Sequence, residues 1–452
     1  MSSKLLIAKP FVKYPIKSNG DIGIPLGLLY LANYVRERNP ATAISFKDYR
    51  VEQYNGNIRN LENDLADADI IASGGSTTEI PDTLRILRTA KRLGKITVAG
   101  GIFPSSNPDY MLRSGVVDYV VRGEGEETFA ELLKAIESNR PINNLPGVSY
   151  NARGTFVHNK HREAIDLSKL PLPAYDLAPM KDYAEVSTGS IYSARGCNKA
   201  CEFCTVSRHW NYSYRPRPVQ SILKEMEILL DYGFSRIHFK DESMLQDRER
   251  AMQLFTAIKE HGFNVGIKGK ARLDQLDPEL LETMKGAGVD MLHIGVESVS
   301  EQSLRDMHKG VSRKDIQANL EMILAQGIGV NPVYMFSWPG ETISDLAANA
   351  DFIKEFGSND NVTTYISFIT PHPGTRLRKK AIRKKLRILT NDLDRYNHKT
   401  PVAFPQSLGR RGLELMIDTY HNLARVLDME HVNPEIDLGY RYRMISRQRL
   451  AA

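Results

Sequence analysis

The three cysteines of this chain, Cys197, Cys201 and Cys204, stand together in a Cys-x3-Cys-x2-Cys run. Thiolates are soft ligands that select iron–sulfur clusters, zinc and copper(I). The 452 residues contain no fourth cysteine, so a four-iron cluster bound here leaves one iron without a protein thiolate. An open metal position is where a small molecule can bind and react. The run therefore indicates a catalytic iron–sulfur cluster.

The cysteines have two other interpretations. A structural zinc site normally closes with four ligands, and His209, five residues after Cys204, is the nearby imidazole that could complete one. Three buried and inert thiols are the second alternative. A disulfide framework does not fit, because it needs an even number of cysteines and usually a small secreted chain.

Together with Phe203, the cysteine run resembles the cluster motif of the radical S-adenosylmethionine (SAM) superfamily. The resemblance implies that the open iron chelates the amino and carboxylate groups of SAM. It also implies that one electron from the cluster splits SAM into methionine and a 5'-deoxyadenosyl radical, which abstracts hydrogen from an unactivated carbon. The cofactors then carry the difficult chemistry, and the protein orients the reactants and excludes water.

The composition is that of a soluble globular protein, with 42% hydrophobic and 25% charged residues. The length of the chain predicts two or three domains. No apolar stretch of about 18 residues or more occurs, and the first residues have the pattern of a strand. We therefore expect a cytoplasmic protein, whose thiols stay reduced.

Residues 1–140 alternate short apolar runs with helical patterns. Strands are predicted at 5–9, 43–46, 70–73, 96–99 and 117–121, and helices at 25–38, 81–93 and 126–136. This order predicts an α/β fold with a doubly wound parallel sheet, which binds ligands at the carboxyl ends of its strands. Small residues gather after the third and fourth strands: Gly74, Gly75, Thr77, Gly100 and Gly101.

This first domain resembles the cobalamin-binding domain that precedes the radical SAM domain in one large subgroup of the superfamily. The resemblance makes the five small residues candidate cobalamin contacts. The chain departs from cobalamin domains that supply a histidine to cobalt, because its first histidine is His158. A degenerate, Rossmann-like scaffold without cobalamin is the alternative.

Residues 141–188 are predicted to be an ordered linker, because prolines break the periodicity and a hairpin is expected across 147–157. From 189 to 377 the alternation of strands and helices resumes. Strands are predicted at 191–194, 236–239, 264–268, 291–295, 329–336 and 364–369, with helices such as 219–232 and 247–261 between them. Six such units predict a partial (β/α)6 barrel, which places its chemistry at the carboxyl ends of the strands.

Several polar residues follow these predicted strand ends, in the order that the superfamily resemblance requires. The resemblance assigns the SAM ammonium to Glu242 with Asp241, and the SAM carboxylate to Arg272, whose guanidinium matches carboxylate geometry. It assigns the ribose hydroxyls to Glu297 or Ser298. It places Phe203 beside adenine. Ordinary surface ion pairs are the alternative for each of these charges.

Residues 378–452 are predicted to form a small, mostly helical substrate or lid region, with a helix at 412–427. A basic run precedes and enters this region, with eight Lys or Arg residues between Arg376 and Arg387. Such runs are usually solvated helix faces. They can also receive an anionic substrate, a flavodoxin or ferredoxin-type reductant, or an acidic membrane surface. Nucleic acid is not expected, because no recognition motif accompanies the charges.

The sequence thus predicts a radical SAM enzyme with a four-iron four-sulfur cluster, SAM and a possible cobalamin. With cobalamin, the resemblance implies C-methylation of a small-molecule, natural-product or lipid substrate. Without it, the same radical could drive dehydration, epimerisation, cyclisation or carbon–carbon bond formation. A non-catalytic iron–sulfur sensor or scaffold is an alternative of another class, and it would not need Glu242, Arg272 and Glu297.

Overall fold

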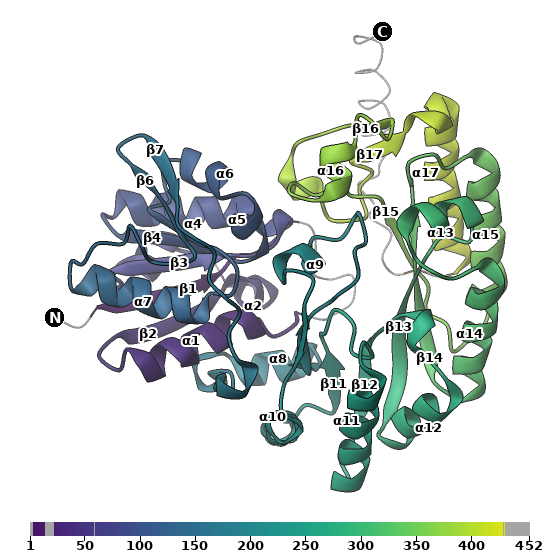
Figure 1. Ribbon diagram of the computed structural model, residues 1–452, viewed down its shortest axis with the longest axis horizontal. Coiled ribbons are helices and arrows are strands. Elements are labelled where there is room, and N and C mark those ends of the chain that lie inside the picture. The colour runs from purple at the N-terminus through teal and green to yellow at the C-terminus, as the bar shows by residue number, and fades with distance from the viewer. Residues whose placement is uncertain (1–2, 14–21, 58, 428, 430–452) are drawn as a thin grey trace. The chain divides into compact units, whose positions relative to one another are not determined.

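The computed structural model contains two compact units (Figure 1). The first comprises residues 1–196 and 208–235, and the second comprises residues 197–207 and 236–452. The structure describes residues 3–13, 22–57, 59–427 and 429. The cysteine loop groups with the second unit, whereas residues 141–188, predicted as a linker, group with the first.

A parallel sheet forms the centre of the first unit, as predicted. Its strands lie in the order β2-β1-β3-β4-β5-β6-β7, and the first five are mutually parallel. Every strand predicted in this part of the chain is present. The bounds are β1 Lys4–Lys9, β2 Ala43–Asp48, β3 Ile70–Gly74, β4 Ile96–Gly100, β5 Tyr119–Val121, β6 Val148–Ala152 and β7 Thr155–His158.

The last two strands, β6 and β7, form the predicted hairpin. β6 pairs antiparallel with β5, so the hairpin extends the sheet instead of standing apart as a connector. The turn uses Arg153 and Gly154, both with positive φ, and the Asn151 side chain accepts a hydrogen bond from the Gly154 amide at 2.7 Å. Antiparallel pairing on an open sheet edge explains why residues after 141 belong to the first unit.

The helices of the first unit cover both faces of its sheet (Figure 1). α1 packs against α7, and α4 packs against β3 and β4. The predicted helices correspond to α1, α4 and α7, and four shorter helices were not predicted. The bounds are α1 Leu26–Arg38, α2 Tyr49–Tyr54, α3 Leu61–Leu65, α4 Ile80–Arg92, α5 Ile102–Ser106, α6 Pro108–Arg113 and α7 Glu126–Glu137.

Residues 174–196 and 208–235 complete the first unit. A buried network anchors them, in which Glu225 accepts hydrogen bonds from Tyr30 and Tyr175 and pairs with Arg217 at 2.7 Å. The elements are α8 Met180–Val186, β8 Gly189–Ile191, β9 Ala194–Gly196, β10 Tyr214–Pro216 and α10 Val219–Asp231, and α9 Val206–His209 spans the border between the units.

The second unit repeats a strand followed by a helix, as the sequence predicted. Within it the parallel strands lie in the order β15-β14-β13-β12-β11. The bounds are β11 Arg236–Phe239, α11 Arg248–His261, β12 Gly266–Ala271, α12 Pro278–Gly286, β13 Val289–Glu297, α13 Glu301–Met307, α14 Arg313–Ala325, β14 Gly329–Phe336, α15 Ile343–Gly357 and β15 Tyr365–Phe368.

Local sequence sets the ends of these helices. The Asp247 carboxylate caps α11 by accepting from the Arg250 amide at 3.0 Å, and Gly262 ends the helix with φ +79°. Ser312 and Asp315 form a reciprocal capping box at the start of α14. These are standard start and stop signals, and they fix where each strand-to-helix loop begins.

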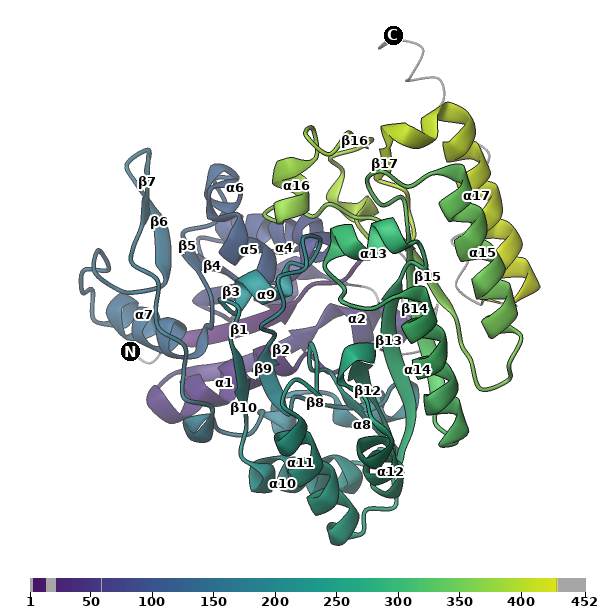
Figure 2. The same cartoon turned by 45° about the vertical axis from the view of Figure 1, so that its right-hand side comes forward.

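After β15 the chain adds a small group of elements. They are α16 Arg376–Lys380, the antiparallel pair β16 Leu386–Ile388 and β17 Ala403–Pro405, and α17 Gly409–Val426. α17 packs alongside α15 (Figure 2), and it corresponds to the helix predicted at 412–427.

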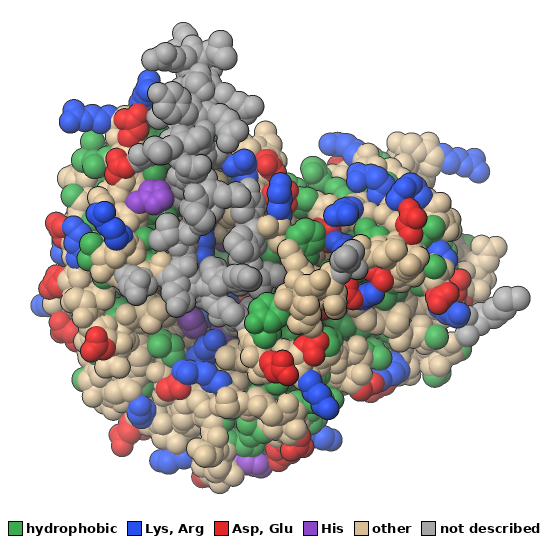
Figure 3. Space-filling view, turned by 180° about the vertical axis from the view of Figure 1, so that it is seen from behind, with side chains coloured by type: hydrophobic (Ala, Val, Ile, Leu, Met, Phe, Trp, Pro, Cys, Tyr) green, Lys and Arg blue, Asp and Glu red, His purple; other side chains and the backbone are tan. Residues whose placement is uncertain are grey.

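No helix within the described residues is long and apolar enough to cross a membrane. On the face shown in Figure 3, acidic and basic side chains are interspersed. This is the usual character of a solvated protein surface.

The carboxyl ends of β3 and β4 approach each other very closely. A Cβ added to Gly74 would lie 1.8 Å from the carbonyl oxygen of Gly100, and the Gly75 amide donates to that same oxygen at 3.1 Å. Gly101 has φ +95°, and a Cβ there would lie 3.0 Å from the Gly75 nitrogen. Gly74 and Gly101 therefore have a structural reason to be where they are, which is the close approach of two backbones.

Replacing Gly74 with alanine should destabilise the first unit, because the new methyl group has no space beside Gly100. We expect the free energy of unfolding in denaturant to fall by about 1–3 kcal/mol. Gly27→Ala in α1 is the matched control, since its Cβ would meet nothing within 4 Å. A Gly74→Ala protein as stable as the control would contradict this account of the strand ends.

Candidate functional site

The cysteine run forms a short turn at the start of the second unit. Cys197 is buried, Cys201 and Cys204 are partly exposed, and all three are free thiols. The Cys204 amide donates to the Cys201 carbonyl at 3.3 Å. Among the described residues, no three His, Cys, Asp or Glu side chains gather around one point as a single metal ion requires. A cluster that takes one thiolate per iron does not require that convergence, so the donor set fits it.

Gln246 secures the first cysteine of the turn. Its amide nitrogen donates to the Cys197 sulfur at 3.7 Å and to the Asn198 side-chain oxygen at 2.9 Å. Its amide oxygen accepts from the Asn198 backbone nitrogen at 3.1 Å. Three contacts from one side chain hold the beginning of the turn in place. Gln246 lies in no recognisable motif, so it could not be identified from the sequence.

Positive charge faces the second cysteine. Burial raises the pKa of the Cys201 thiol above its ordinary value, and the positive charges of Lys309 and Arg272 oppose that rise. The Glu297 carboxylate and Cys197 act in the same direction as burial. Cations beside a cysteine favour the thiolate, which is the form that binds metal.

Arg272, the predicted partner of the SAM carboxylate, is held rigidly. Its guanidinium binds both Asp274 carboxylate oxygens at 2.8 and 3.1 Å, and it donates to the Lys309 carbonyl at 2.8 Å. Lys199, two residues before Cys201, lies 3.6 Å from Asp274. Asp274 therefore links Arg272 to the cysteine loop. A fork-to-carboxylate contact orients the guanidinium plane and lowers the cost of fixing it when a ligand binds.

Glu297 ends β13 at an irregularity of the sheet. The pairing of β13 with β14 shifts register between Gly295 and Glu297, and Glu297 has φ +68°. Such a bulge re-aims a side chain at the end of a strand. The Glu297 carboxylate lies 3.4 Å from the Lys309 ammonium, which also donates to the Gly295 carbonyl at 2.7 Å.

Ser298, the other candidate for the ribose hydroxyls, is buried in a network of its own. Its hydroxyl lies 3.2 Å from the Asn349 side-chain oxygen, which also accepts from the Val299 amide at 2.7 Å. These bonds engage Ser298 in shaping the loop after β13. Of the two side chains, the Glu297 carboxylate is therefore more accessible than the Ser298 hydroxyl.

Asp241 and Glu242 lie in the loop after β11, one residue beyond the end of the strand, as predicted from the strand order. Asp241 is buried with 1% exposure, and Glu242 is partly exposed. The next residue, Ser243, donates to Gln275 at 2.7 Å. This bond ties the loop after β11 to the loop after β12, which carries Arg272.

Phe203 packs into an apolar cluster between two cysteines of the turn. Its ring meets Trp338 edge to face, with centroids 6.2 Å apart. The buried members of this cluster are Met307, Met335, Trp338, Ile369, Leu377, Ala381, Leu386 and Ala403. The aromatic contact anchors the turn from one side, which is an additional role to the predicted one beside adenine.

Glu202 anchors the turn from another side. Its carboxylate is almost buried and pairs with Lys380 at 2.5 Å and with Lys384 at 2.6 Å. The Glu202 carbonyl accepts from the Leu377 amide at 3.0 Å. The Lys384 ammonium also lies 5.4 Å from the centroid of the Trp338 ring. Part of the basic run, which the sequence left without a role, therefore holds the cysteine loop.

The loop after β14 contains a buried carboxylic acid, Glu341. Burial raises its pKa to about 8. Its oxygens accept from the Ser337 amide at 2.7 Å and from the Asn349 side chain at 3.3 Å. Ser337 has φ +74°, a strained conformation that this bond helps to maintain. Asn349 thus links the loops after β13 and β14.

In the first unit, the candidate cobalamin contacts lie where such sheets bind ligands. The chain order reverses between β1 and β3. Gly74 is the last residue of β3, and Gly75 and Thr77 follow it. Glu79 caps the same turn through Ser76 and pairs with Lys9 at the end of β1. Residues 14–21, the other part of the loop after β1, lie outside the described residues. The ends of β3 and β4 lie close together and are rich in glycine. Such a backbone allows the close approach of a ligand.

No histidine of the first unit lies on these strand ends. His209 packs edge to face on Trp210, and burial lowers its pKa to about 4. The glycine loop after β5 is closed by charge pairs, in which Arg195 binds Glu124 at 2.8 Å and Glu126 at 2.6 Å.

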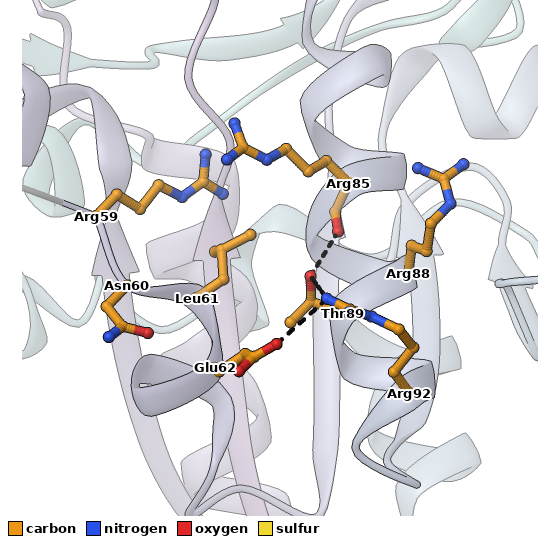
Figure 4. A pocket seen from close by; sticks show the side chains of 8 residues that line it. All are labelled: Arg59, Asn60, Leu61, Glu62, Arg85, Arg88, Thr89 and Arg92. Atoms are coloured by element: carbon orange, nitrogen blue, oxygen red, sulfur yellow. Dashed lines mark hydrogen bonds and ion pairs between the residues drawn. The ribbon is translucent and has the colours of Figure 1, made fainter.

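A separate hollow of about 380 Å³ lies between α3 and α4, away from all the predicted site residues in the sequence (Figure 4). Arg92 reaches Glu62 at 3.4 Å and Arg59 pairs with Asp82 at 2.7 Å. Arg85 and Arg88 form no ion pair with any residue that the structure describes. The lining residues are Arg59, Asn60, Leu61, Glu62, Arg85, Arg88, Thr89 and Arg92.

Comparison with known protein families decides between the interpretations of the cysteines. The sequence model of the radical SAM superfamily matches residues 191–353, and that of the B12 binding domain matches residues 15–133. The chain carries a B12-binding domain and a radical SAM domain. The predicted resemblance is confirmed, and the radical SAM domain implies a four-iron four-sulfur cluster and SAM.

Individual relatives agree with this domain pair. The chain is 29% identical over 409 residues to an uncharacterized methyltransferase of Pyrococcus horikoshii, covering 88% of this chain and 87% of that protein. It is 24% identical over 421 residues to cytidylyl-2-hydroxyethylphosphonate methyltransferase of Streptomyces wedmorensis, covering 80% and 78%. The radical SAM methyltransferase TsrM of Kitasatospora setae, solved with cobalamin and a [4Fe-4S] cluster, matches with TM-score 0.75 at 16% identity, covering 95% and 89%. This last likeness confirms the predicted fold.

The radical SAM domain also contains functional candidates that sequence reasoning missed. Gln246, Lys309 and Asn349 lie in no motif, and only their contacts reveal them. Lys380 and Lys384 were visible as part of a basic run, but nothing in the run indicated Glu202 as their partner.

Removing the Glu202 carboxylate should loosen the cysteine loop. In Glu202→Gln, two lysines lose the carboxylate that neutralises them, so we expect the free energy of unfolding to fall by about 1–3 kcal/mol. We also expect the reconstituted cluster to lose iron to a chelator several times faster than in the parent, followed by visible absorbance. The exposed Glu260→Gln is the control. Equal iron loss in both variants would contradict a role of Glu202 in holding the loop.

The raised pKa of Glu341 predicts a pH dependence of stability. The folded state keeps a proton that the unfolded state releases above its ordinary pKa, so stability is lost as pH rises toward about 8. This loss amounts to at most about 1.4 kcal/mol per pH unit. Glu341→Gln should remove that part of the slope when unfolding is measured between pH 5 and 9. The same slope in the parent and in Glu341→Gln would exclude a buried neutral Glu341.

Proposed function

We propose that the protein is a cobalamin-dependent radical SAM methyltransferase that transfers a methyl group to an unactivated carbon of a small molecule. One observation carries the proposal: a loop of three free thiols, faced by Lys309 and Arg272, occurs in one chain with a B12-binding domain. Two relatives that are named methyltransferases, and that this chain matches over most of their length, support the type of reaction.

The bound groups supply the radical chemistry, since the cluster and SAM furnish the hydrogen-abstracting radical and cobalamin furnishes a transferable methyl group. The chain's own residues bind and orient them. Cys197, Cys201 and Cys204 hold the cluster through three thiolates. Arg272, fixed by Asp274, receives the SAM carboxylate, and the carboxylate of Glu242 faces the ammonium.

The remaining assignments concern ribose, adenine and cobalamin. Glu297, re-aimed by the bulge at the end of β13, accepts from the ribose hydroxyls, and Phe203 borders adenine. Gly74, Gly75, Thr77, Gly100 and Gly101 present backbone to cobalamin at the end of the first sheet. No histidine precedes His158, so the preceding residues would offer no imidazole to a bound cobalamin.

The substrate and partners follow from the chemistry. We propose a natural-product or lipid-like small molecule as substrate, since radical methylation serves carbons that lack acidity or nucleophilicity. The electron donor is proposed to be a flavodoxin or ferredoxin. The compartment is proposed to be the cytoplasm, where free thiols persist.

Anaerobic reconstitution tests this function. With iron, sulfide, cobalamin, SAM and dithionite, we expect 5'-deoxyadenosine from the parent protein and none above background from Cys201→Ala, because the cluster needs all three thiolates. We also expect about one corrinoid per chain in the visible spectrum of protein produced with cobalamin. Corrinoid binding without formation of 5'-deoxyadenosine would contradict the proposed radical SAM activity. Formation of 5'-deoxyadenosine without bound corrinoid would contradict the proposed cobalamin-dependent methyl transfer.

A further inference from the structure

The segment 376–388 connects the cysteine loop with the protein surface. On its inner side, Lys380 and Lys384 bind Glu202, the residue directly after Cys201. The Leu377 amide binds the Glu202 carbonyl, and Leu377 lies in the apolar cluster that receives Phe203. The inner side of the segment is thus in direct contact with the loop that holds the cluster.

The outer side of the same segment is cationic and contains one exposed apolar residue. Lys379, Arg383 and Lys385 are exposed and form no ion pair with any described residue. Ile382 stands among them with 94% of its surface exposed. We call these four residues the outer patch. α16, at the start of the segment, and β16, at its end, are labelled in Figure 1.

Structural needs of the second unit do not explain the outer patch. The segment 376–388 contains eight basic residues and no acidic one. Two of the basic residues serve Glu202, and Arg378 bonds to Tyr396 and Asn391 at 3.0 and 2.6 Å. The like charges of the outer patch repel one another. An exposed isoleucine adds nothing to folding stability, whereas it can anchor a docked partner.

We propose that the outer patch docks the acidic protein that delivers one electron to the cluster. The proposal rests on the proposed function, because a cluster that cleaves SAM must be reduced from outside. The donor loses one electron and the cluster gains it, so no other reactant is needed. Charge complementarity steers an acidic partner to the patch, and the small apolar centre suits a transient electron-transfer encounter.

An anionic membrane is the other surface that a basic patch could meet. A membrane-binding helix presents a broad apolar face alongside its basic residues. Here α16 covers only Arg376–Lys380, and Ile382 is the single large apolar residue of the segment that is strongly exposed. The contact of this segment with the cluster loop also gives a protein donor a reason to dock there. These observations favour the protein donor.

The Arg383→Glu/Lys385→Glu double variant tests the proposal. Neither residue touches Glu202, so the ion pairs of Glu202 with Lys380 and Lys384 stay in place. Arg85→Glu/Arg88→Glu on α4 is the matched control. It reverses the same number of exposed basic charges elsewhere on the chain, and these too form no ion pair with a described residue. Cluster reduction is followed anaerobically with reduced acidic bacterial flavodoxin, and separately with excess dithionite, which needs no docking surface.

At low ionic strength we expect the flavodoxin-driven rate to fall at least about tenfold in the Arg383/Lys385 variant and to stay near the parent value in the control. Added salt should slow the parent and narrow the difference. Ile382→Ser should lower the rate without changing its salt dependence. Dithionite should reduce all variants alike, with the same cluster spectrum and the same yield of 5'-deoxyadenosine.

Three outcomes would overturn the proposal. If the flavodoxin-driven rate is unchanged in the Arg383/Lys385 variant, the outer patch is not the docking site. The proposed enzyme function would still stand if dithionite yields 5'-deoxyadenosine. If the control variant loses the same fraction of the flavodoxin-driven rate, the effect comes from the net charge of the protein and not from the outer patch. Binding to phosphatidylglycerol vesicles that the double variant abolishes, with an unchanged flavodoxin rate, assigns the patch to a membrane instead.

Discussion

A cluster held by three thiolates depends on a loop whose sulfur atoms stay in place, and a short turn has few contacts with which to fix itself. In this protein the loop is fixed from three sides. Gln246 binds its beginning, Phe203 inserts beside Trp338, and Glu202 is held by two lysines. Gln246, Trp338 and Lys380 come from three different segments of the second unit, the loop after β11, the loop after β14 and the helix α16. The positions of the three sulfur atoms therefore depend on the packing of the whole unit.

Charge around the loop follows from the same constraint. Two cations, Lys309 and Arg272, face Cys201, and each is oriented by a carboxylate close by. A buried cation without such a partner is costly, and one with a partner is fixed in direction. The arrangement supplies positive charge for thiolates and for an incoming carboxylate while keeping each guanidinium or ammonium group in a set place. The loops after β12 and β13 thus act together on the second cysteine.

In the first unit, the ends of β3 and β4 expose backbone and few side chains. Its strand ends approach so closely that side chains at Gly74 and Gly101 would collide with neighbouring backbone. An edge that presents backbone in place of side chains allows the close approach of a ligand. The polar side chains nearby, including Glu79 and Asp82, are already paired with Lys9 and Arg59. At this edge, the backbone is therefore the main group available to bind a ligand.

The sequence by itself determined the domain pair and indicated the candidate metal ligands. Strand and helix periods are local properties, and Cys197, Cys201 and Cys204 are neighbours in the chain, so no distant contact was needed to recognise them. It could also place Arg272 and Glu242 at strand ends, because parallel strands bring those ends to one edge. Only the tertiary structure decided which residues hold the loop and which partners engage the candidates. Lys380 lies 178 residues from Glu202, and Ser298 meets Asn349 across 51 residues. Such pairs form through the packing of separate elements, and no spacing along the chain encodes them.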